Sequence, residues 1–167
     1  MLETERLTLS RLSYDDAQFI FDLVNEPAFK QFIGVRKVHT LDDAKAYLRN
    51  GPMDNYEKHG FGLYLVCLRE NGTPVGICGL VKREDLEFPD LGFAFLQAYW
   101  SNGFAHESSV ATIGYAREQL GLSRIIAIVN GDNRKSISLL KKLGFGFEKM
   151  TRLRGESADI CRYALDL

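Results

Sequence analysis

The chain is organised around the stretch Asp90-Leu91-Gly92-Phe93-Ala94-Phe95-Leu96-Gln97-Ala98-Tyr99-Trp100-Ser101-Asn102-Gly103-Phe104-Ala105-His106-Glu107. Its apolar, aromatic-rich part (91–96) predicts a buried strand, the small residues at 101–103 predict a turn, and a helical pattern runs from there to about residue 120. A strand that turns into a helix leaves backbone N–H groups pointing out of the turn, with the positive end of the helix dipole behind them. Such a turn can receive a phosphate or be an ordinary connection, so the rest of the chain must decide.

The residues that follow predict a second strand and a second helix. The apolar run 125–129 is typical of a strand that is buried on both faces, as in a parallel sheet. Asn133 starts a further helix and Gly144 ends it. Strand, helix and strand over 91–129 therefore form a βαβ unit with a right-handed crossover. The 101–103 turn and the start of the Asn133 helix then lie at the carboxyl ends of adjacent parallel strands, where open α/β sheets bind ligands.

The first half of the chain predicts one strand followed by helices. The strand covers about 4–12, and the capping pairs Ser13/Asp16 and Thr40/Asp43 each precede a helical pattern. A short helix is expected over 28–33. The helix after Thr40 should carry Leu41, Ala44 and Leu48 inward and break at Gly51-Pro52. A further helical piece is expected over 53–59.

Strand-like patterns occupy most of the remainder. The runs 61–68 and 75–81 flank Asn71-Gly72, a strong hairpin signal, and a two-residue loop there would place Cys67 opposite Gly76. The runs 145–152 and 158–165 predict two closing strands joined near Arg154-Gly155-Glu156. No linker or repeat divides residues 1–167. The predicted fold is a single α/β domain with a mixed sheet of about six or seven strands.

Composition excludes several classes of protein. The 167 residues, 46% of them hydrophobic, suffice for one domain with a substantial core. Twenty-one basic and 22 acidic residues give a net charge of -1, so we expect neither a nucleic-acid nor a membrane partner. The three cysteines lack C-x-x-C spacing and the three histidines are scattered, so no disulfide framework and no metal site are expected. The N-terminus lacks the apolar core of a signal peptide, which favours a reduced, cytoplasmic protein.

Several nucleotide and hydrolase motifs are missing from the sequence. No P-loop and no G-x-G-x-x-G follows a strand, which argues against nucleotide hydrolysis and dinucleotide redox chemistry. The G-x-S-x-G nucleophile elbow is also missing.

Three motifs in register resemble the GNAT N-acetyltransferases, above all the branch with the ribosomal-protein N-terminal acetyltransferases. They are the opening Glu3-Thr4-Glu5-Arg6-Leu7, the stretch from Leu91 to Glu107, and Asn133-x-x-Ser136-x-x-Leu139-Leu140-x-x-Leu143-Gly144-Phe145. The resemblance covers essentially the whole chain. It implies a mostly antiparallel sheet with a central parallel strand pair and about four helices. It also implies an enzyme that transfers the acetyl group of acetyl-CoA to a primary amine by direct attack.

The resemblance assigns the acetyl-CoA contacts to the opening stretch. The family's pyrophosphate loop corresponds to Trp100, Ser101, Asn102, Gly103, Phe104 and Ala105. Ser101 and Asn102 replace the Gly-Lys that is common in the branch, so the loop has lost a cation and must rely more on backbone N–H groups. Phe95, Leu96 and Gln97 are expected beside the pantetheine, where the strand edge can pair with its amides. A backbone N–H near Leu96 is expected to polarise the thioester carbonyl.

The second motif supplies two polar side chains. Asn133 is expected to contact the pantetheine arm, and Ser136 to stabilise or protonate the leaving thiolate. The alternative is that Asn133 only caps its helix, and the two roles are compatible. Some family members carry a tyrosine seven positions after the asparagine as general acid, but Leu140 stands there in this chain.

The general base and the acceptor are less constrained by the sequence. Asp90 is the first candidate for the base, directly or through water, and Glu107 is the second, although its position also suits the helix dipole. Further candidates are Glu84, Asp85, Glu87 and Tyr99. The acceptor should meet 29–39 and 152–159, where Phe29, Phe32, Tyr56 and Phe61 could form an apolar wall and Arg36 with Lys37, or Arg152 with Arg154, could bind an acidic peptide.

Three hypotheses about function remain open. The first is acetylation of a protein N-terminus, and the second is acetylation of a small amine such as a polyamine, an amino acid or an aminoglycoside. The third is a CoA-binding sensor that has lost catalysis. An acidic acceptor pocket would favour a polyamine or an aminoglycoside, and an open groove would favour a peptide. Monomer and homodimer both remain open.

Overall fold

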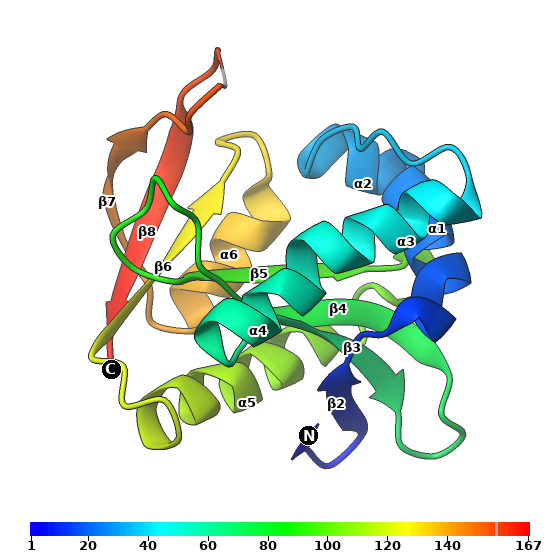
Figure 1. Ribbon diagram of the computed structural model, residues 1–167. Coiled ribbons are helices and arrows are strands. Elements are labelled where there is room, and N and C mark those ends of the chain that lie inside the picture. Colours follow the sequence, from blue (N-terminus) through cyan, green and yellow to red (C-terminus); the bar gives the residue numbers. More distant parts are fainter. Residues whose placement is uncertain (156) are drawn as a thin grey trace.

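A single sheet with the strand order β1-β2-β3-β4-β5-β6-β8-β7 organises the protein. The computed structural model describes residues 1–155 and 157–167 (Figure 1). The strands are β1 (Leu2–Glu3), β2 (Leu7–Arg11), β3 (Leu63–Leu68), β4 (Pro74–Val81), β5 (Asp90–Phe95), β6 (Arg124–Val129), β7 (Gly146–Thr151) and β8 (Ile160–Asp166). Only the β5–β6 pairing among them is parallel. The predicted mixed sheet with a central parallel pair is confirmed, with eight described strands in place of six or seven.

Helices cover both faces of this sheet and create two cores. The α-helices are α1 (Ala17–Asn25), α2 (Pro27–Phe32), α3 (Leu41–Leu48), α4 (Asp54–His59), α5 (Phe104–Glu118) and α6 (Arg134–Lys142). Helices α1 to α4 gather on one side of the sheet (Figure 1). There α1, α2 and α3 pack on Leu65, Ile77 and Ala94, whereas α5 and α6 pack on a second cluster around Val75, Leu91 and Ile125. Alternate residues of β5 therefore face different helices.

Local capping signals predicted the helix starts well. At Thr40, the side chain accepts a hydrogen bond from the Asp43 N–H, and the Asp43 carboxylate accepts one from the Thr40 N–H. The Ser13/Asp16 box has the same reciprocal bonds, but it caps a 3₁₀ turn (Tyr14–Asp16) that leads into α1. The prediction that Leu41 points inward was wrong, since its side chain is 45% exposed at the first position of α3.

The expected break at Gly51-Pro52 was also wrong. A π-helical turn over Arg49–Met53 joins α3 to α4, with Pro52 inside it. A π turn is wider than an α turn, so it absorbs the proline without ending the helical path. The predicted helical piece at 53–59 is confirmed as α4, which ends at Gly60 in the left-handed conformation.

The hairpin between β3 and β4 has a different register from the predicted one. Val66 lies opposite Gly76 and Cys67 opposite Pro74, with a bulge between Val66 and Cys67. The cause is a loop longer than two residues, closed by a hydrogen bond from the Gly72 N–H to the Leu68 carbonyl (2.8 Å). The closing strands β7 and β8 form the second predicted hairpin. Of its expected turn, Glu156 lies outside the described residues.

Strands β5 and β6 separate soon after they meet. Their pairing consists of Asp90 opposite Ile126, and β6 and β8 then run at a steep angle to β4 and β5 (Figure 1). The carboxyl end of β5 consequently presents an open edge. The candidate site lies at this opening.

Candidate functional site

The open edge of β5 offers one backbone donor in particular. The N–H of Leu96 donates to the Val75 carbonyl of β4 (3.0 Å), so the predicted donor role does not hold for Leu96 itself. Because N–H groups alternate between the two sides of a strand, the N–H of Phe95 points to the open side. The Phe95 carbonyl accepts a hydrogen bond from the Trp100 indole N–H (2.8 Å), which ties the strand to the following loop. The available donor is thus one residue earlier than expected.

The loop after β5 has the geometry of an anion cradle. Ser101 (φ 65°) and Gly103 (φ 82°) both adopt left-handed backbone conformations. The Asn102 amide closes the loop by donating to the Tyr99 carbonyl (3.1 Å) and the Trp100 carbonyl (3.2 Å). Among the described residues, the backbone N–H groups from 101 to 106 have no acceptor. Free N–H groups at the start of a long helix suit a phosphate.

Glu107 is committed to holding this loop. Its carboxylate accepts hydrogen bonds from the Thr4 hydroxyl (2.6 Å), the Arg6 N–H (2.9 Å) and the Arg6 guanidinium (2.7 Å). Partial burial acts to raise the pKa of Glu107, but the bonds from Thr4 and Arg6 outweigh it and lower the pKa below its ordinary value. A carboxylate so engaged is a poor proton acceptor, so the geometry argues against Glu107 as the base.

Asn133 and Ser136 sit together at the start of α6. The Asn133 side-chain oxygen accepts a hydrogen bond from the Ser136 N–H (3.2 Å), so the capping role is confirmed. Asn133 is only 9% exposed. Within the described chain, neither its side-chain NH₂ nor the Ser136 hydroxyl has a hydrogen-bond partner, and both are left for a ligand. Leu140 is buried in the core, so this position does not offer a side chain to the site.

One large cavity collects most of the residues that the sequence singled out. Its volume is about 1230 Å³, and it is lined by Phe95, Trp100, Ser101, Gly103, Phe104, Ala105, Asn133 and Ser136, together with Phe29 and Phe32 of α2. Leu96, Gln97 and Asn102 do not line it. The Gln97 N–H instead donates to the Glu26 carboxylate (3.0 Å).

The cavity also carries cations that the sequence reading did not single out. Arg134, Lys135 and Lys142 of α6 line it, and the Lys135 ammonium lies 4.9 Å from the centre of the Trp100 ring. Arg6 reaches the loop from the N-terminal segment by donating to the Asn102 carbonyl (3.0 Å). These side chains provide positive charge that Ser101-Asn102 lacks. Lys135 could have been suspected from its place in the first turn of α6, but no local signal links Arg6 to the loop.

Asp90 lies away from this cavity. Its side chain is 2% exposed, and its carboxylate accepts from the Arg83 Nε at 3.2 and 3.4 Å. Burial raises the pKa of Asp90, against the opposing effect of the Arg83 charge. At roughly 3.3 Å per residue, Asp90 and Phe95 are about 16 Å apart along the strand. Asp90 could therefore take a proton from an amine near Phe95 only through intervening water.

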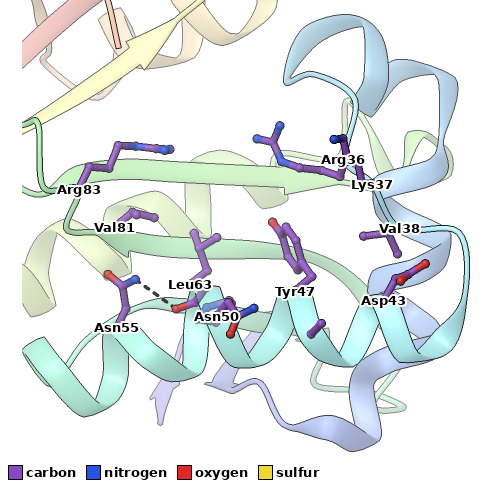
Figure 2. Close-up of a pocket in the computed structure, with 13 residues that line it drawn as sticks. Arg36, Lys37, Val38, Asp43, Tyr47, Asn50, Asn55, Leu63, Val81 and Arg83 are labelled. Carbon is purple, nitrogen blue, oxygen red and sulfur yellow. Dashed lines mark hydrogen bonds between the residues drawn. The ribbon is translucent and has the colours of Figure 1, made fainter. Parts of the chain in front are cut away.

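Figure 2 shows a second cavity, of about 410 Å³. It is lined by Arg36, Lys37, Val38, Asp43, Ala46, Tyr47, Asn50, Gly51, Pro52, Asn55, Leu63, Val81 and Arg83. Val81, one of its lining residues, pairs with Asp90 in the β4–β5 register, so the two side chains lie on the same face of the sheet. One continuous segment borders both cavities, because 28–33 contributes to the larger one and 36–38 to the smaller. The smaller cavity therefore lies next to the larger one along this segment.

The other residues predicted to contact the acceptor lie in the larger cavity, in the core or outside both cavities. Phe29 and Phe32 line the larger cavity, whereas Tyr56 and Phe61 belong to the core, where the Tyr56 hydroxyl accepts from the Leu12 N–H (3.1 Å). Arg152 pairs with Asp159, and neither it nor Arg154 lines either cavity.

Across residues 1–155 and 157–167, no group of three His, Cys, Asp or Glu side chains is placed to bind a metal ion. None of the helices described for this chain is both long enough and apolar enough to cross a membrane.

Comparisons with known proteins point to an acetyltransferase domain. A family model for the acetyltransferase (GNAT) domain matches residues 6–146. The uncharacterized N-acetyltransferase YoaA of Bacillus subtilis is 29% identical over 154 residues, covering 91% of this chain and 86% of YoaA. An acetyltransferase structure from Agrobacterium tumefaciens superposes with a TM-score of 0.85 at 24% identity over 99% of this chain and 94% of the other.

A structural neighbour with coenzyme A bound has the same fold. It is RimL, a ribosomal L7/L12 alpha-N-protein acetyltransferase, with a TM-score of 0.81 at 15% identity. The superposition covers 98% of this chain and 96% of RimL.

Proposed function

This chain belongs to the GNAT acetyltransferase family, and from that premise we propose that it acetylates a primary amine with acetyl-CoA by direct attack, a protein N-terminus being the first candidate acceptor. The observation that carries the proposal is the larger cavity. It joins the unbonded N–H groups of Ser101 and 103–106, the open N–H of Phe95 and the free polar groups of Asn133 and Ser136 in one space of about 1230 Å³.

The residues of the cavity divide the work of holding acetyl-CoA. The N–H groups of Ser101 and 103–106 suit the pyrophosphate because they can donate hydrogen bonds to its oxygens. The Lys135 ammonium beside them attracts its negative charge. The open edge at Phe95 suits the amides of the pantetheine, and the Asn133 NH₂ can add a further hydrogen bond. The Phe95 N–H takes over the polarising role that the sequence had placed near Leu96.

The chemistry requires proton movement at the amine and at the sulfur. The acceptor loses one proton to become a free amine, its nitrogen then bonds to the carbonyl carbon, and the carbon–sulfur bond breaks. A second proton passes from nitrogen to the departing thiolate, so that N-acetylated acceptor and CoA result. The Ser136 hydroxyl, free at the cavity wall, is the group we assign to stabilising that thiolate.

Calorimetry and an acceptor screen test this proposal. Acetyl-CoA and CoA are titrated into the protein, and CoA release is then followed with peptides, amino acids, polyamines and aminoglycosides. Ser136→Ala should lower kcat by about tenfold, as expected for the loss of one hydrogen bond to a charged group, and leave the acetyl-CoA Kd unchanged. Ser123→Ala, outside both cavities, is the control.

The outcomes separate the hypotheses. Absence of acetyl-CoA and CoA binding at micromolar concentrations would overturn the proposal. Binding without turnover of any acceptor would favour the alternative of a sensor that has lost catalysis. Turnover of small amines but not of peptides would favour the second hypothesis.

A further inference from the structure

The smaller cavity brings three cationic side chains to one rim. Arg36 and Lys37 come from the segment after α2, and Arg83 comes from the loop after β4. Figure 2 shows Arg36 and Arg83 extending toward each other across the cavity. Like charges that approach in this way repel unless an anion lies between them.

The described residues leave most of these cationic groups without a partner. Arg36 and Lys37 make no ion pair with a described carboxylate, and Arg83 uses only its Nε, so both Nη groups remain available. Asp43 is the acidic residue among those that line the cavity, and its carboxylate is bound by the His39 and Thr40 N–H groups. It cannot neutralise the rim as well.

Each of the two arginines contacts one buried residue. Arg83 is anchored by Asp90, whose carboxylate is buried beside Val81 in the β4–β5 register. The Arg36 guanidinium lies over the Phe29 ring (5.9 Å) and close to Gly34. Held guanidinium groups lose less side-chain entropy on binding and present a fork that matches a carboxylate.

Tyr47 adds a neutral hydrogen-bonding group to the same space. Its ring rises from α3 toward β5, and its hydroxyl has no partner within 1–155 and 157–167 (Figure 2). Leu63 and Val81 supply an apolar floor. The cavity thus offers a cationic rim, a hydroxyl and an apolar base.

Small side chains lie between this cavity and the carboxyl end of β5. Gly92 lies between Asp90 and Ala94 on the same face, and a Cβ there would already approach Leu63 (3.3 Å) and Val81 (3.8 Å). Ala94 lines the larger cavity. An acceptor seated against the rim could extend its amine over Gly92 toward the edge at Phe95.

We infer that this cavity selects acceptors that carry a carboxylate on the residue that bears the amine or on the residue after it, bound between Arg36 and Arg83. The inference rests on the proposed function, because it names the acceptor class of that reaction. It disfavours polyamines and aminoglycosides, whose cations the rim repels. Asp90 then acts as a positioning residue that holds Arg83.

The test compares matched acceptors. One arm uses free amino acids against the same amino acids as amides. The other uses peptide amides whose second residue is Asp or Glu against those with Asn or Gln. The first arm reports an α-carboxylate and the second a side-chain carboxylate. At least one carboxylate form should exceed its neutral partner by about tenfold or more in kcat/KM, as expected for a hydrogen bond to a charged group.

Variants connect the preference to the rim. Arg36→Gln and Arg83→Gln should each remove most of the preference by raising the acceptor KM, while the acetyl-CoA Kd stays constant by calorimetry. Arg49→Gln, which is exposed on the neighbouring turn and outside both cavities, should keep it.

Several results would overturn the inference. The first is turnover of the amides, of spermidine or of kanamycin that equals or exceeds turnover of the carboxylate forms. The second is no turnover of any carboxylate-bearing amine. The third is a preference for the carboxylate forms that survives in both arginine variants. Failure of the proposed function itself is distinguishable, because acetyl-CoA would then not bind in calorimetry.

Discussion

Arg6 and Glu107, 101 residues apart in the sequence, are joined through both the backbone N–H (2.9 Å) and the guanidinium (2.7 Å) of Arg6. The same guanidinium lies 4.8 Å from the Phe104 ring centre. The N-terminal segment therefore clamps the start of α5 directly beneath the anion cradle.

Glu107→Gln tests this clamp through pH. Since the folded-state pKa lies below the ordinary 4.5, the contribution to stability is present above that value and is lost as pH falls through the folded pKa. Glu107→Gln should lower the Tm by about 3 °C near neutral pH, for a pair worth roughly 1 kcal/mol. The difference from wild type should shrink as the pH falls below 4.5. Thermal unfolding followed by circular dichroism measures this, with Glu118→Gln as control; a difference independent of pH would contradict it.

Ser101→Gly should stabilise the protein. Ser101 has φ 65°, and a non-glycine residue in this region costs of order 1 kcal/mol, part of which glycine loses again through its greater freedom when unfolded. We expect a net gain of about 0.5 kcal/mol in the free energy of unfolding, measured with urea. Ser138→Gly, in the exposed part of α6, should lose about 0.5 kcal/mol. A loss at both positions would contradict the strain at Ser101.

Gly76→Ala should damage the fold and the donor site together. A Cβ at Gly76 would lie 2.4 Å from the Phe95 ring and 2.6 Å from the Ala94 carbonyl oxygen. The overlap should cost about 2 kcal/mol or more, and the shift of Phe95 should weaken acetyl-CoA binding. Gly114→Ala in α5, with nothing within 4 Å of the added Cβ, should gain about 1 kcal/mol and leave binding unchanged. Urea unfolding and calorimetry distinguish the two.

Lys135→Gln should weaken acetyl-CoA binding by about threefold to tenfold at low salt, because it removes a cation beside the loop. Raising the salt concentration should narrow the difference from wild type, since screening already reduces the lost attraction. Calorimetry at two salt concentrations measures both effects. Lys141→Gln on the same helix, outside the cavity, should bind as wild type does.

Asp90→Asn separates two roles for this carboxylate. If Asp90 positions Arg83, the acceptor KM rises by about tenfold and kcat changes little. If it is the base, kcat falls and the acidic limb of the pH–rate profile disappears. We expect the first result, because Asp90 is bonded to Arg83 and distant from Phe95. The second would restore the base assignment made from the sequence.

The sequence revealed those parts of the structure that depend on neighbours along the chain. Thr40 and Asn133 cap their helices through residues three positions away, and both bonds are present. The helix break predicted at Gly51-Pro52 was wrong because a wider helical turn accommodates the proline. The predicted hairpin register was wrong because of the bulge at Val66/Cys67. Contacts between distant segments carried no signal that one sequence could show.

In the candidate site, too, the features that depend on neighbouring residues were predicted and those that depend on distant contacts were not. The cradle around Gly103 and the polar pair at α6 were predicted by residue type and spacing, and the structure brings them to one cavity. The shift of the donor from Leu96 to Phe95 depends on how β4 pairs with β5, and the pairing of Arg83 with Asp90 depends on a loop conformation. Neither follows from local propensity.

The short helix α2 bridges the opening between β5 and β6. At its start the Glu26 carboxylate accepts from the Gln97 N–H beyond β5, and at its end the Phe32 carbonyl accepts from the Asn130 side chain beyond β6 (3.1 Å). With about 1.5 Å per residue, the helix spans roughly 9 Å. It lies across the opening as a spacer of fixed length, so we expect the width available to the acetyl donor to follow from the number of residues between these two hydrogen bonds.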